Sequence, residues 1–267
     1  MKEKNTTILL GEMTRDEAKE RIKECDVAIL PVGSLEQHGP HLPLDTDAFD
    51  AYWLAQKVAK KVAPPRPVVC PPINYGVSYH HMDFAGTLTI EPATLSNLTY
   101  EIGISLVKHG IRKILIINGH GGNTPALNCT AQRLNDETNI LVCVESGNIT
   151  AKEQKRLFKT KNDVHSGEYE TSTSLANREE LVRKDRIRKP EMKFLSRHLE
   201  FEGKNVVPFK YRVKDISKTG VLGDPTKANK KKGEKIWNLT IDALVKVVED
   251  LKKIKVRMRE FRGHQMG

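Results

Sequence analysis

Apolar runs alternate with helical patterns along the first 150 residues of the chain. The runs are rich in β-branched side chains, which is typical of strands buried on both faces of a parallel sheet, and they cover residues 27–32, 68–70, 113–117 and 140–144. Before and between them, apolar residues recur every three or four positions and predict helices over residues 14–23, 48–59, 92–109 and 124–134. This alternation predicts an α/β fold with a mostly parallel sheet covered by helices on both faces.

Local signals mark the ends of these helices. Thr14 and Glu17 have the spacing of a capping box at the start of the first helix. Gly110 stands where a glycine commonly ends a helix, and Thr124 followed by Pro125 predicts an N-cap and a first helical residue.

The pattern becomes irregular after residue 150. We predict a helix from Glu170 to Leu181, a mixed stretch over residues 206–216 and a long terminal helix from about Thr226 to Met258. Neither an internal repeat nor a low-complexity linker divides the sequence, so we predict a single domain over residues 1–267.

Composition limits the class of protein. A hydrophobic content of 38% with 29% charged residues is typical of a globular protein, and the apolar runs are shorter than the roughly 20 residues that span a bilayer. The first residues are polar and lack the apolar core of a secretory signal, so we expect a cytoplasmic protein without a membrane partner. Four widely spaced cysteines, mostly in apolar surroundings, predict buried, reduced thiols.

The net charge of +10 raises the question of an anionic partner. The basic residues gather late in the chain, are interleaved with acidic residues and lack the aromatic neighbours that single-stranded nucleic acid requires. We therefore interpret them as solvated faces and expect no nucleic-acid partner.

Candidate metal ligands follow two of the predicted strands. Glu36 and His38 are two residues apart in the loop after the first strand, so on extended backbone both side chains point to one face. Asp47 lies at the start of the next helix, and His120 follows a different strand between glycines. Carboxylate and imidazole ligands suit Zn²⁺, Mn²⁺ or Fe²⁺. The alternative for His120 alone is a turn or packing role.

A third segment adds donors of the same kind. His165, Glu168 and Glu170 lie in a short loop that leads into the predicted helix from residue 170. Taken alone, these residues are equally compatible with a helix N-terminal cap. Together with the first two segments, they favour a metal site.

These motifs resemble the creatininase (creatinine amidohydrolase) family over most of residues 27–235. The resemblance rests on GSLEQHGPHLP at 33–43 with the following Thr46 and Asp47, NGHGGN at 118–123, HSGEYETS at 165–172, and the late GDP at 223–225 with KGE at 232–234. It implies a three-layer α/β/α sandwich, usually a homohexamer, with a two-metal site that hydrolyses cyclic amides or related C–N bonds.

The resemblance also implies roles for single residues. It makes Glu36 and His120 ligands of one metal, His38 a ligand of the second metal and Asp47 the bridge between them. His165 matches the residue that transfers a proton, and Glu170 either orients neighbouring groups or caps the helix.

One position departs from the creatininase pattern. Creatininase draws a carboxylate ligand from the position that is Gly122 here, and glycine has no side chain. Family members with the Gly-Gly version carry a glutamate three residues after the later histidine, which is Glu168 in this chain. We therefore predict that Glu168 completes the shell of the second metal.

The implied chemistry is attack of a metal-bound hydroxide on a carbonyl of a small cyclic amide or formamide, with His165 protonating the leaving nitrogen. Creatininase covers creatinine with tryptophans, whereas this chain has only Trp53 and Trp237, so we expect a different small-molecule substrate. Basic residues in the segment before His165 suit an anionic or polyhydroxylated substrate or form a solvated helix face: Lys155, Arg156, Lys159 and Lys161.

Two alternatives stay open at this point. The same family includes a deformylase, a peptidase that matures a redox-cofactor precursor, and a hydrolase that opens a diketo-inositol ring. The first alternative is this ring opening by C–C cleavage, which begins with the same attack on a carbonyl. From another class, the chain is a non-catalytic metal-binding or ligand-binding protein.

Overall fold

The central sheet has four strands in the order β2-β1-β3-β4, and every neighbouring pair is parallel. We describe a computed structural model over residues 7–202, 205–206 and 211–256. The strands are β1 (Val27–Val32), β2 (Val68–Val69), β3 (Lys113–Asn118) and β4 (Leu141–Glu145). The apolar runs therefore form the parallel sheet that the sequence predicts.

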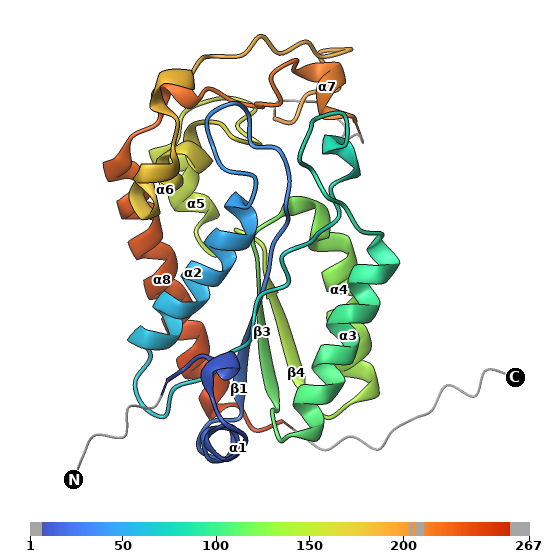
Figure 1. Ribbon diagram of the computed structural model, residues 1–267, viewed down its shortest axis with the longest axis vertical. Helices are drawn as coiled ribbons and strands as arrows, with labels where there is room; N and C mark the ends of the chain where they lie inside the picture. The colour runs from blue at the N-terminus through green and yellow to red at the C-terminus, as the bar shows by residue number, and fades with distance from the viewer. Residues whose placement is uncertain (1–6, 203–204, 207–210, 257–267) are drawn as a thin grey trace, which may run out of the picture.

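Helices cover both faces of this sheet (Figure 1). On one face lie α2 (Thr46–Lys61) and α8 (Lys230–Lys253), and on the other α3 (Pro92–Lys108) and α4 (Thr124–Glu137). Alternate residues of β1 enter the two cores, since Val27 and Ile29 pack with α2 and α8 whereas Ala28 and Leu30 pack with α3 and α4. The result is the expected three-layer α/β/α arrangement.

Helix ends follow local chemistry, with small corrections to the prediction. The capping box of Thr14 and Glu17 is present at α1 (Arg15–Glu24). Thr124 is the first residue of α4 rather than its N-cap, because a 3-10 turn over Gly121–Asn123 runs directly into the helix. The terminal helix begins later than predicted, because the Asn229 side chain accepts the N–H of Lys231 and caps α8 there.

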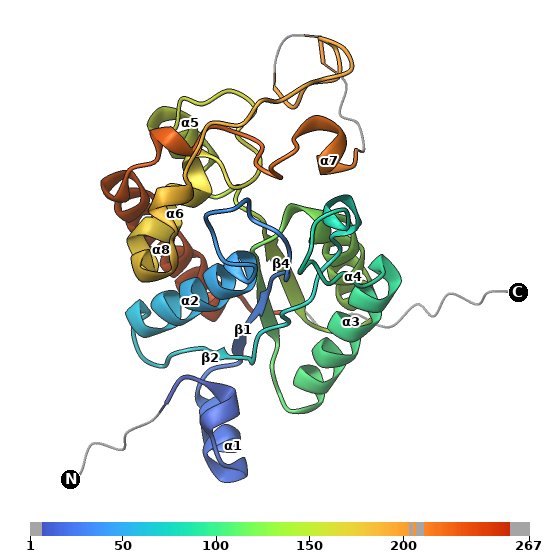
Figure 2. The same ribbon diagram turned by 45° about the horizontal axis from the view of Figure 1, so that its top comes forward.

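The later part of the chain packs across the top of the sheet (Figure 2). It contains α5 (Ala151–Leu157), α6 (Glu168–Asn177) and α7 (Val213–Ile216). The predicted helix from Glu170 to Leu181 is α6 followed by a separate 3-10 turn, Glu179–Leu181. The terminal helix ends at Lys253, earlier than the predicted end at Met258. Met258 itself and residues 207–210 of the mixed stretch lie outside the described residues.

Strand register brings two loops together. Val32 of β1 pairs with Asn118 of β3, so both strands end at the same level of the sheet. The segments that follow them meet there, as expected for the carboxyl ends of parallel strands.

Two further expectations concern the cysteines and the membrane. All four thiols are free, but only Cys25 and Cys70 are buried, whereas Cys143 is half-buried and Cys129 is exposed. Among the helices of the described segments, none has the length and apolar character needed to cross a lipid bilayer.

Candidate metal centre

The site lies where β1 and β3 end. The loop after β1 carries Glu36 and His38, and His120 follows β3. Asp47 lies in the first turn of α2, which begins directly after the β1 loop. None of these four residues is more than 6% exposed. The structure thus brings together the first two segments of candidate ligands.

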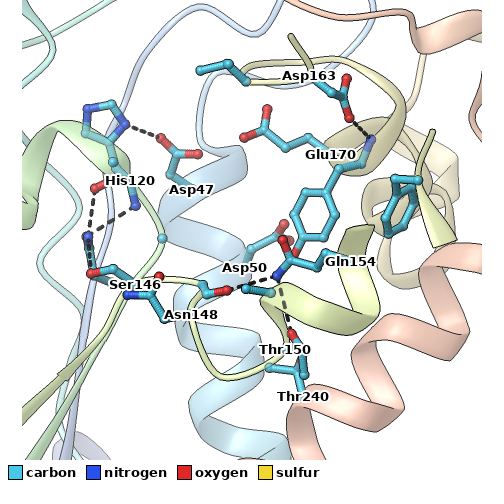
Figure 3. Close-up of a pocket in the computed structure, with 18 of the residues that line it drawn as sticks. Asp47, Asp50, His120, Ser146, Asn148, Thr150, Gln154, Asp163, Glu170 and Thr240 are labelled. Atoms are coloured by element: carbon cyan, nitrogen blue, oxygen red, sulfur yellow. Dashed lines mark hydrogen bonds and ion pairs between the residues drawn. The ribbon is translucent and has the colours of Figure 1, made fainter. Parts of the chain in front are cut away.

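A close backbone approach joins α2 to the loop after β3. A Cβ atom at Gly119 would lie 2.2 Å from the carbonyl oxygen of Asp47, so only glycine fits there. This approach lets His120 reach Asp47, with 3.2 Å between Nδ1 and Oδ2 (Figure 3).

Short distances connect the four side chains. Nε2 of His38 lies 3.1 Å from Oδ1 of Asp47, and Nδ1 of His120 lies 3.3 Å from Oε1 of Glu36. Donor atoms of Glu36, His38 and Asp47 all lie within 4.8 Å of one another. One small volume therefore receives nitrogen and oxygen donors from three segments of the chain.

Backbone carbonyls fix the orientation of two imidazole rings. Nδ1 of His38 donates to the carbonyl oxygen of Glu36, and Nε2 of His120 donates to that of Val77, both at 3.0 Å. A carbonyl oxygen only accepts, so each of these nitrogens carries a proton, and the other nitrogen of each ring points toward the carboxylates. This arrangement is typical of metal-binding histidines.

The carboxylates also fit a metal. Oε1 of Glu36 and Oδ2 of Asp47 are buried and have no hydrogen-bond partner. Buried polar atoms are normally satisfied, so two such acceptors beside imidazole nitrogens fit a bound cation. Imidazole and carboxylate donors are the set that Zn²⁺ and Mn²⁺ accept.

Without a metal, protons balance the carboxylates. Burial acts to raise the pKa of Glu36, but the facing His120 outweighs it and lowers this pKa to about 2. Burial likewise acts to lower the pKa of His38, but Asp47 reverses the effect and raises it to about 10. Metal binding must therefore displace protons from the imidazole rings.

The third segment contributes His165 and Glu170. Nδ1 of His165 lies 3.6 Å from Oε1 of Glu36 and 3.8 Å from Oε2 of Glu170, and the same glutamate oxygen lies 3.8 Å from Nε2 of His38. Nε2 of His165 donates to the carbonyl oxygen of Gln37 at 2.7 Å. The lone pair of this ring therefore also faces the centre.

The environment sets the charges of these two residues. Burial, together with the nearby His81 and His38, lowers the pKa of His165 well below its usual range. Burial raises the pKa of Glu170 to about 8 against the opposing effect of His38. His165 is therefore neutral near pH 7, so one of its ring nitrogens carries no proton.

Glu168 does not reach this centre, in contrast to the expected place in the second metal shell. Oε1 forms an ion pair with Nζ of Lys232 at 2.5 Å. Oε2 accepts hydrogen bonds from the backbone N–H groups of Lys159 and Thr160 and from the Thr160 hydroxyl. Glu170, two residues on, is the glutamate of this segment whose carboxylate lies toward the cluster, 3.8 Å from Nε2 of His38.

A side chain at Gly122 would clash with its neighbours in this chain. A Cβ atom there would lie 2.2 Å from the carbonyl oxygen of Val77 and 2.4 Å from Nε2 of His120. The hydrogen bond between those two groups occupies the space that a side chain would need. Residues 121–123 therefore add no carboxylate to the cluster.

The loop over residues 73–87, to whose residues we assigned no individual role from the sequence, contributes side chains that contact the cluster. Oγ of Ser78 donates to Oε2 of Glu36 at 2.5 Å, and Nε2 of His81 lies 3.3 Å from Oε1 of the same glutamate. The His80 ring stacks on His120 with 5.5 Å between centroids. Two adjacent histidines in an ordered loop were the available signal for these neighbours.

Two cavities meet at the cluster. One has a volume of about 910 Å³ and extends toward α5 and α8, and the other has a volume of about 660 Å³ and extends toward residues 77–81 and 211–212. Both are lined by Asp47, His120, Val164 and Glu170. Figure 3 shows Asp47, His120 and Glu170 at one end of the larger cavity and Thr150, Gln154 and Thr240 farther along it.

Buried imidazole and carboxylate donors at the carboxyl ends of parallel strands, beside open cavities, define a metal-dependent hydrolase of the α/β class. The chain belongs to the creatininase family, because the family model described as creatinine amidohydrolase matches residues 11–248.

Relatives in this family have different substrates. A Mycobacterium ulcerans protein named mycofactocin precursor peptide peptidase is 32% identical over 248 residues, which cover 89% of this chain and 90% of that protein. A Thermotoga maritima 3-dehydro-scyllo-inosose hydrolase is 35% identical over 120 residues, which cover 45% of this chain and 38% of that protein.

Solved structures agree with this assignment. A crystal structure of creatinine amidohydrolase (creatininase) is 26% identical, with a TM-score of 0.76 and coverage of 93% of this chain and 99% of that chain. A creatininase structure with Mn is 25% identical, with a TM-score of 0.73 and coverage of 93% and 100%. The chain is thus a creatininase-family hydrolase with a cluster of metal-binding residues.

Proposed function

We propose that this protein is a metal-dependent hydrolase that cleaves the C–N bond of an elongated, peptide-like amide. The observation that carries the proposal is the pair of cavities that meet at Asp47, His120 and Glu170. A small cyclic amide would need only one of them, whereas an extended chain can place an amide bond at the cluster and one arm in each cavity.

The ligand assignment follows the contacts. Glu36 and His120 would hold one divalent ion and His38 and Glu170 a second, with Asp47, which contacts both histidines, shared between them. Such ions supply Lewis acidity, which polarises a carbonyl and lowers the pKa of water toward neutrality. Zn²⁺, Mn²⁺ and Fe²⁺ remain the candidates.

His165 moves the proton. Its Nδ1 faces the cluster with a lone pair and takes a proton from the attacking water, while the water oxygen bonds to the carbonyl carbon. When the C–N bond breaks, the same proton passes to the leaving nitrogen. The products are a carboxylic acid and an amine.

The relatives favour a peptide-like substrate. The peptide peptidase aligns over nine-tenths of its own length, whereas the inosose hydrolase aligns over 38% of its length. The expected small cyclic amide or formamide and the alternative C–C cleavage of a cyclic diketone are therefore tested beside peptides. The hexameric assembly implied by the family stays a separate prediction for sedimentation analysis.

The test is a substrate screen with protein reconstituted in turn with Zn²⁺, Mn²⁺ and Fe²⁺. We expect peptides to release a primary amine faster than creatinine, lactams or formamides. A ring-opened acid without a new amine would favour the C–C alternative. Metal binding without turnover of any of these compounds would favour a non-catalytic binding protein.

A variant of His165 separates catalysis from metal binding. We expect His165→Ala to lose about 10²- to 10⁴-fold in turnover, because it removes proton transfer, and to keep its metal content. His109→Ala is the matched control, because His109 ends α3 just before β3 begins, whereas the site lies where β3 ends. Unchanged turnover in His165→Ala would contradict the assigned role.

A further inference from the structure

Gln37 lies between the metal-binding residues Glu36 and His38, but its side chain points to a different partner. Its amide is 4% exposed and contacts the His81 ring, with 2.7 Å between Nε2 of Gln37 and Nδ1 of His81. The mechanism proposed above uses neither residue.

Two backbone groups fix which way the Gln37 amide faces. Its Oε1 accepts the N–H of Gly39 at 2.9 Å, and its Nε2 donates to the carbonyl oxygen of Gly220 at 3.0 Å. Exchanging the oxygen and nitrogen would oppose two acceptors at Gly220 and two donors at Gly39. A Cβ atom at Gly220 would lie 1.9 Å from Oε1, so this glycine also lets the amide fit.

The fixed amide determines the protonation of His81. An amide nitrogen only donates, so Nδ1 of His81 must accept and cannot carry a proton. The ring is therefore neutral with its proton on Nε2. Nε2 of His81 lies 3.3 Å from Oε1 of Glu36, yet this oxygen accepts no hydrogen bond. The N–H group of His81 is therefore not hydrogen-bonded to Glu36.

Gln37 thus fixes the tautomers of two neighbouring imidazole rings, so that the two rings present opposite groups to the cluster. Its backbone carbonyl accepts from Nε2 of His165, which leaves a lone pair toward the cluster, whereas its side chain leaves an N–H group of His81 toward the cluster. The ring centroids are 4.2 Å apart, and both rings line the 660 Å³ cavity. One ring is thereby a proton acceptor and the other a hydrogen-bond donor.

We propose that Gln37 is a positioning residue that holds His81 as a hydrogen-bond donor to the carbonyl oxygen of the substrate. The proposal rests on the proposed amide hydrolysis, in which negative charge develops on that oxygen. A donor fixed in advance stabilises this charge without reorganisation. It also means that His81 is no metal ligand, although Glu36, His81 and His165 lie close enough to hold an ion.

The first test reads the ring directly and needs no substrate. Zinc-loaded, ¹⁵N-labelled protein is examined by long-range ¹H–¹⁵N correlation of its imidazole rings. We expect the His81 proton on Nε2 in the wild-type protein and a proton on Nδ1 in Gln37→Glu, because a carboxylate accepts where the amide donated. A wild-type proton on Nδ1, or a zinc-bound His81, would overturn the proposal.

The second test is a double-mutant cycle with a substrate identified by the screen. We expect Gln37→Glu and His81→Phe each to lower kcat by about 10²- to 10³-fold, the usual effect of removing such a donor, with unchanged metal content. Gln37→Glu should then cause little further loss in the His81→Phe background. His81→Gln, which keeps an N–H donor, should retain more activity than His81→Phe.

The controls separate the outcomes. Gln56→Glu makes the same charge change in α2 and should leave kcat unchanged. An equal effect of Gln37→Glu with and without His81 would overturn the positioning role. If no amide is cleaved although the ring shows the expected tautomer, the proposed function and the donor role of His81 fail, whereas the hold of Gln37 on His81 is supported.

Discussion

The two glutamates at the start of α6 serve two different regions of the molecule. The carboxylate of Glu170 faces the cluster, 3.8 Å from Nε2 of His38. The carboxylate of Glu168 instead joins Lys232 of α8 to the backbone at Thr160. Because a helix turns by about 100° per residue, side chains two positions apart point to nearly opposite sides.

The difference shows that residue type alone does not decide which carboxylate faces the cluster. Both glutamates are acids in the first turn of the same helix, yet Asp163 caps that helix through the N–H groups of Glu168 and Tyr169 and thereby fixes its rotation. Glu168 is therefore part of a structural junction with Lys232, whereas Glu170 is the glutamate that we propose as a metal ligand.

The largest effect is expected from removing the charge of Glu170, the glutamate that faces the cluster. Glu170→Gln should bind less metal and lose about 10³-fold in turnover, because several kcal/mol of Lewis-acid stabilisation are removed. Metal content by mass spectrometry and initial rates check this. Full metal stoichiometry with normal turnover would show that Glu170 is not a ligand.

The next largest effect is expected from removing the charge of Glu168, which forms the ion pair with Lys232. Glu168→Gln should keep its metal and most of its turnover but lose about 1–3 kcal/mol of unfolding free energy, less than for a fully buried pair, because the Lys232 side chain is 34% exposed. Urea unfolding measures the loss. The matched control is Glu179→Gln, whose exposed ion pairs with Lys184 and Lys230 should contribute less. Loss of metal in Glu168→Gln would return Glu168 to the ligand set.

The smallest effect is the pH dependence of the stability that Glu168 contributes. Burial acts to raise the pKa of Glu168, but Lys232 and Thr160 outweigh it and lower the pKa below its usual range. A lowered pKa contributes stability that is fully present above the unfolded value of about 4.3 and is lost as the pH falls through the folded value. In metal-free protein, the stability difference between wild type and Glu168→Gln should therefore shrink below about pH 4. A difference that grows on acidification would contradict the ion pair.

Much of the fold follows from hydrophobic pattern. The run over residues 27–32 is β1 to the residue, because six consecutive apolar side chains are stable only where both faces of a strand are covered. The later segments were harder to predict, because their positions depend on contacts with distant elements such as the ion pair between Glu168 and Lys232.

The residues of the candidate site likewise fall into those that could be predicted from the sequence and those that could not. Glu36, His38, Asp47 and His120 could be predicted together because strand ends in a parallel sheet meet at one edge. The choice between Glu168 and Glu170 could not, because it depends on how α6 is rotated. His81 and Gln37 were missed as a pair because 44 positions separate them and the loop around His81 has no period.

Anomalous diffraction from crystals of the Mn²⁺-loaded protein tests the central claim most directly. We expect two manganese peaks within coordinating distance of the cluster, one near Glu36 and His120 and the other near His38 and Glu170, with Asp47 between them. A peak coordinated by Glu168, or none at the cluster in fully loaded protein, would contradict the account.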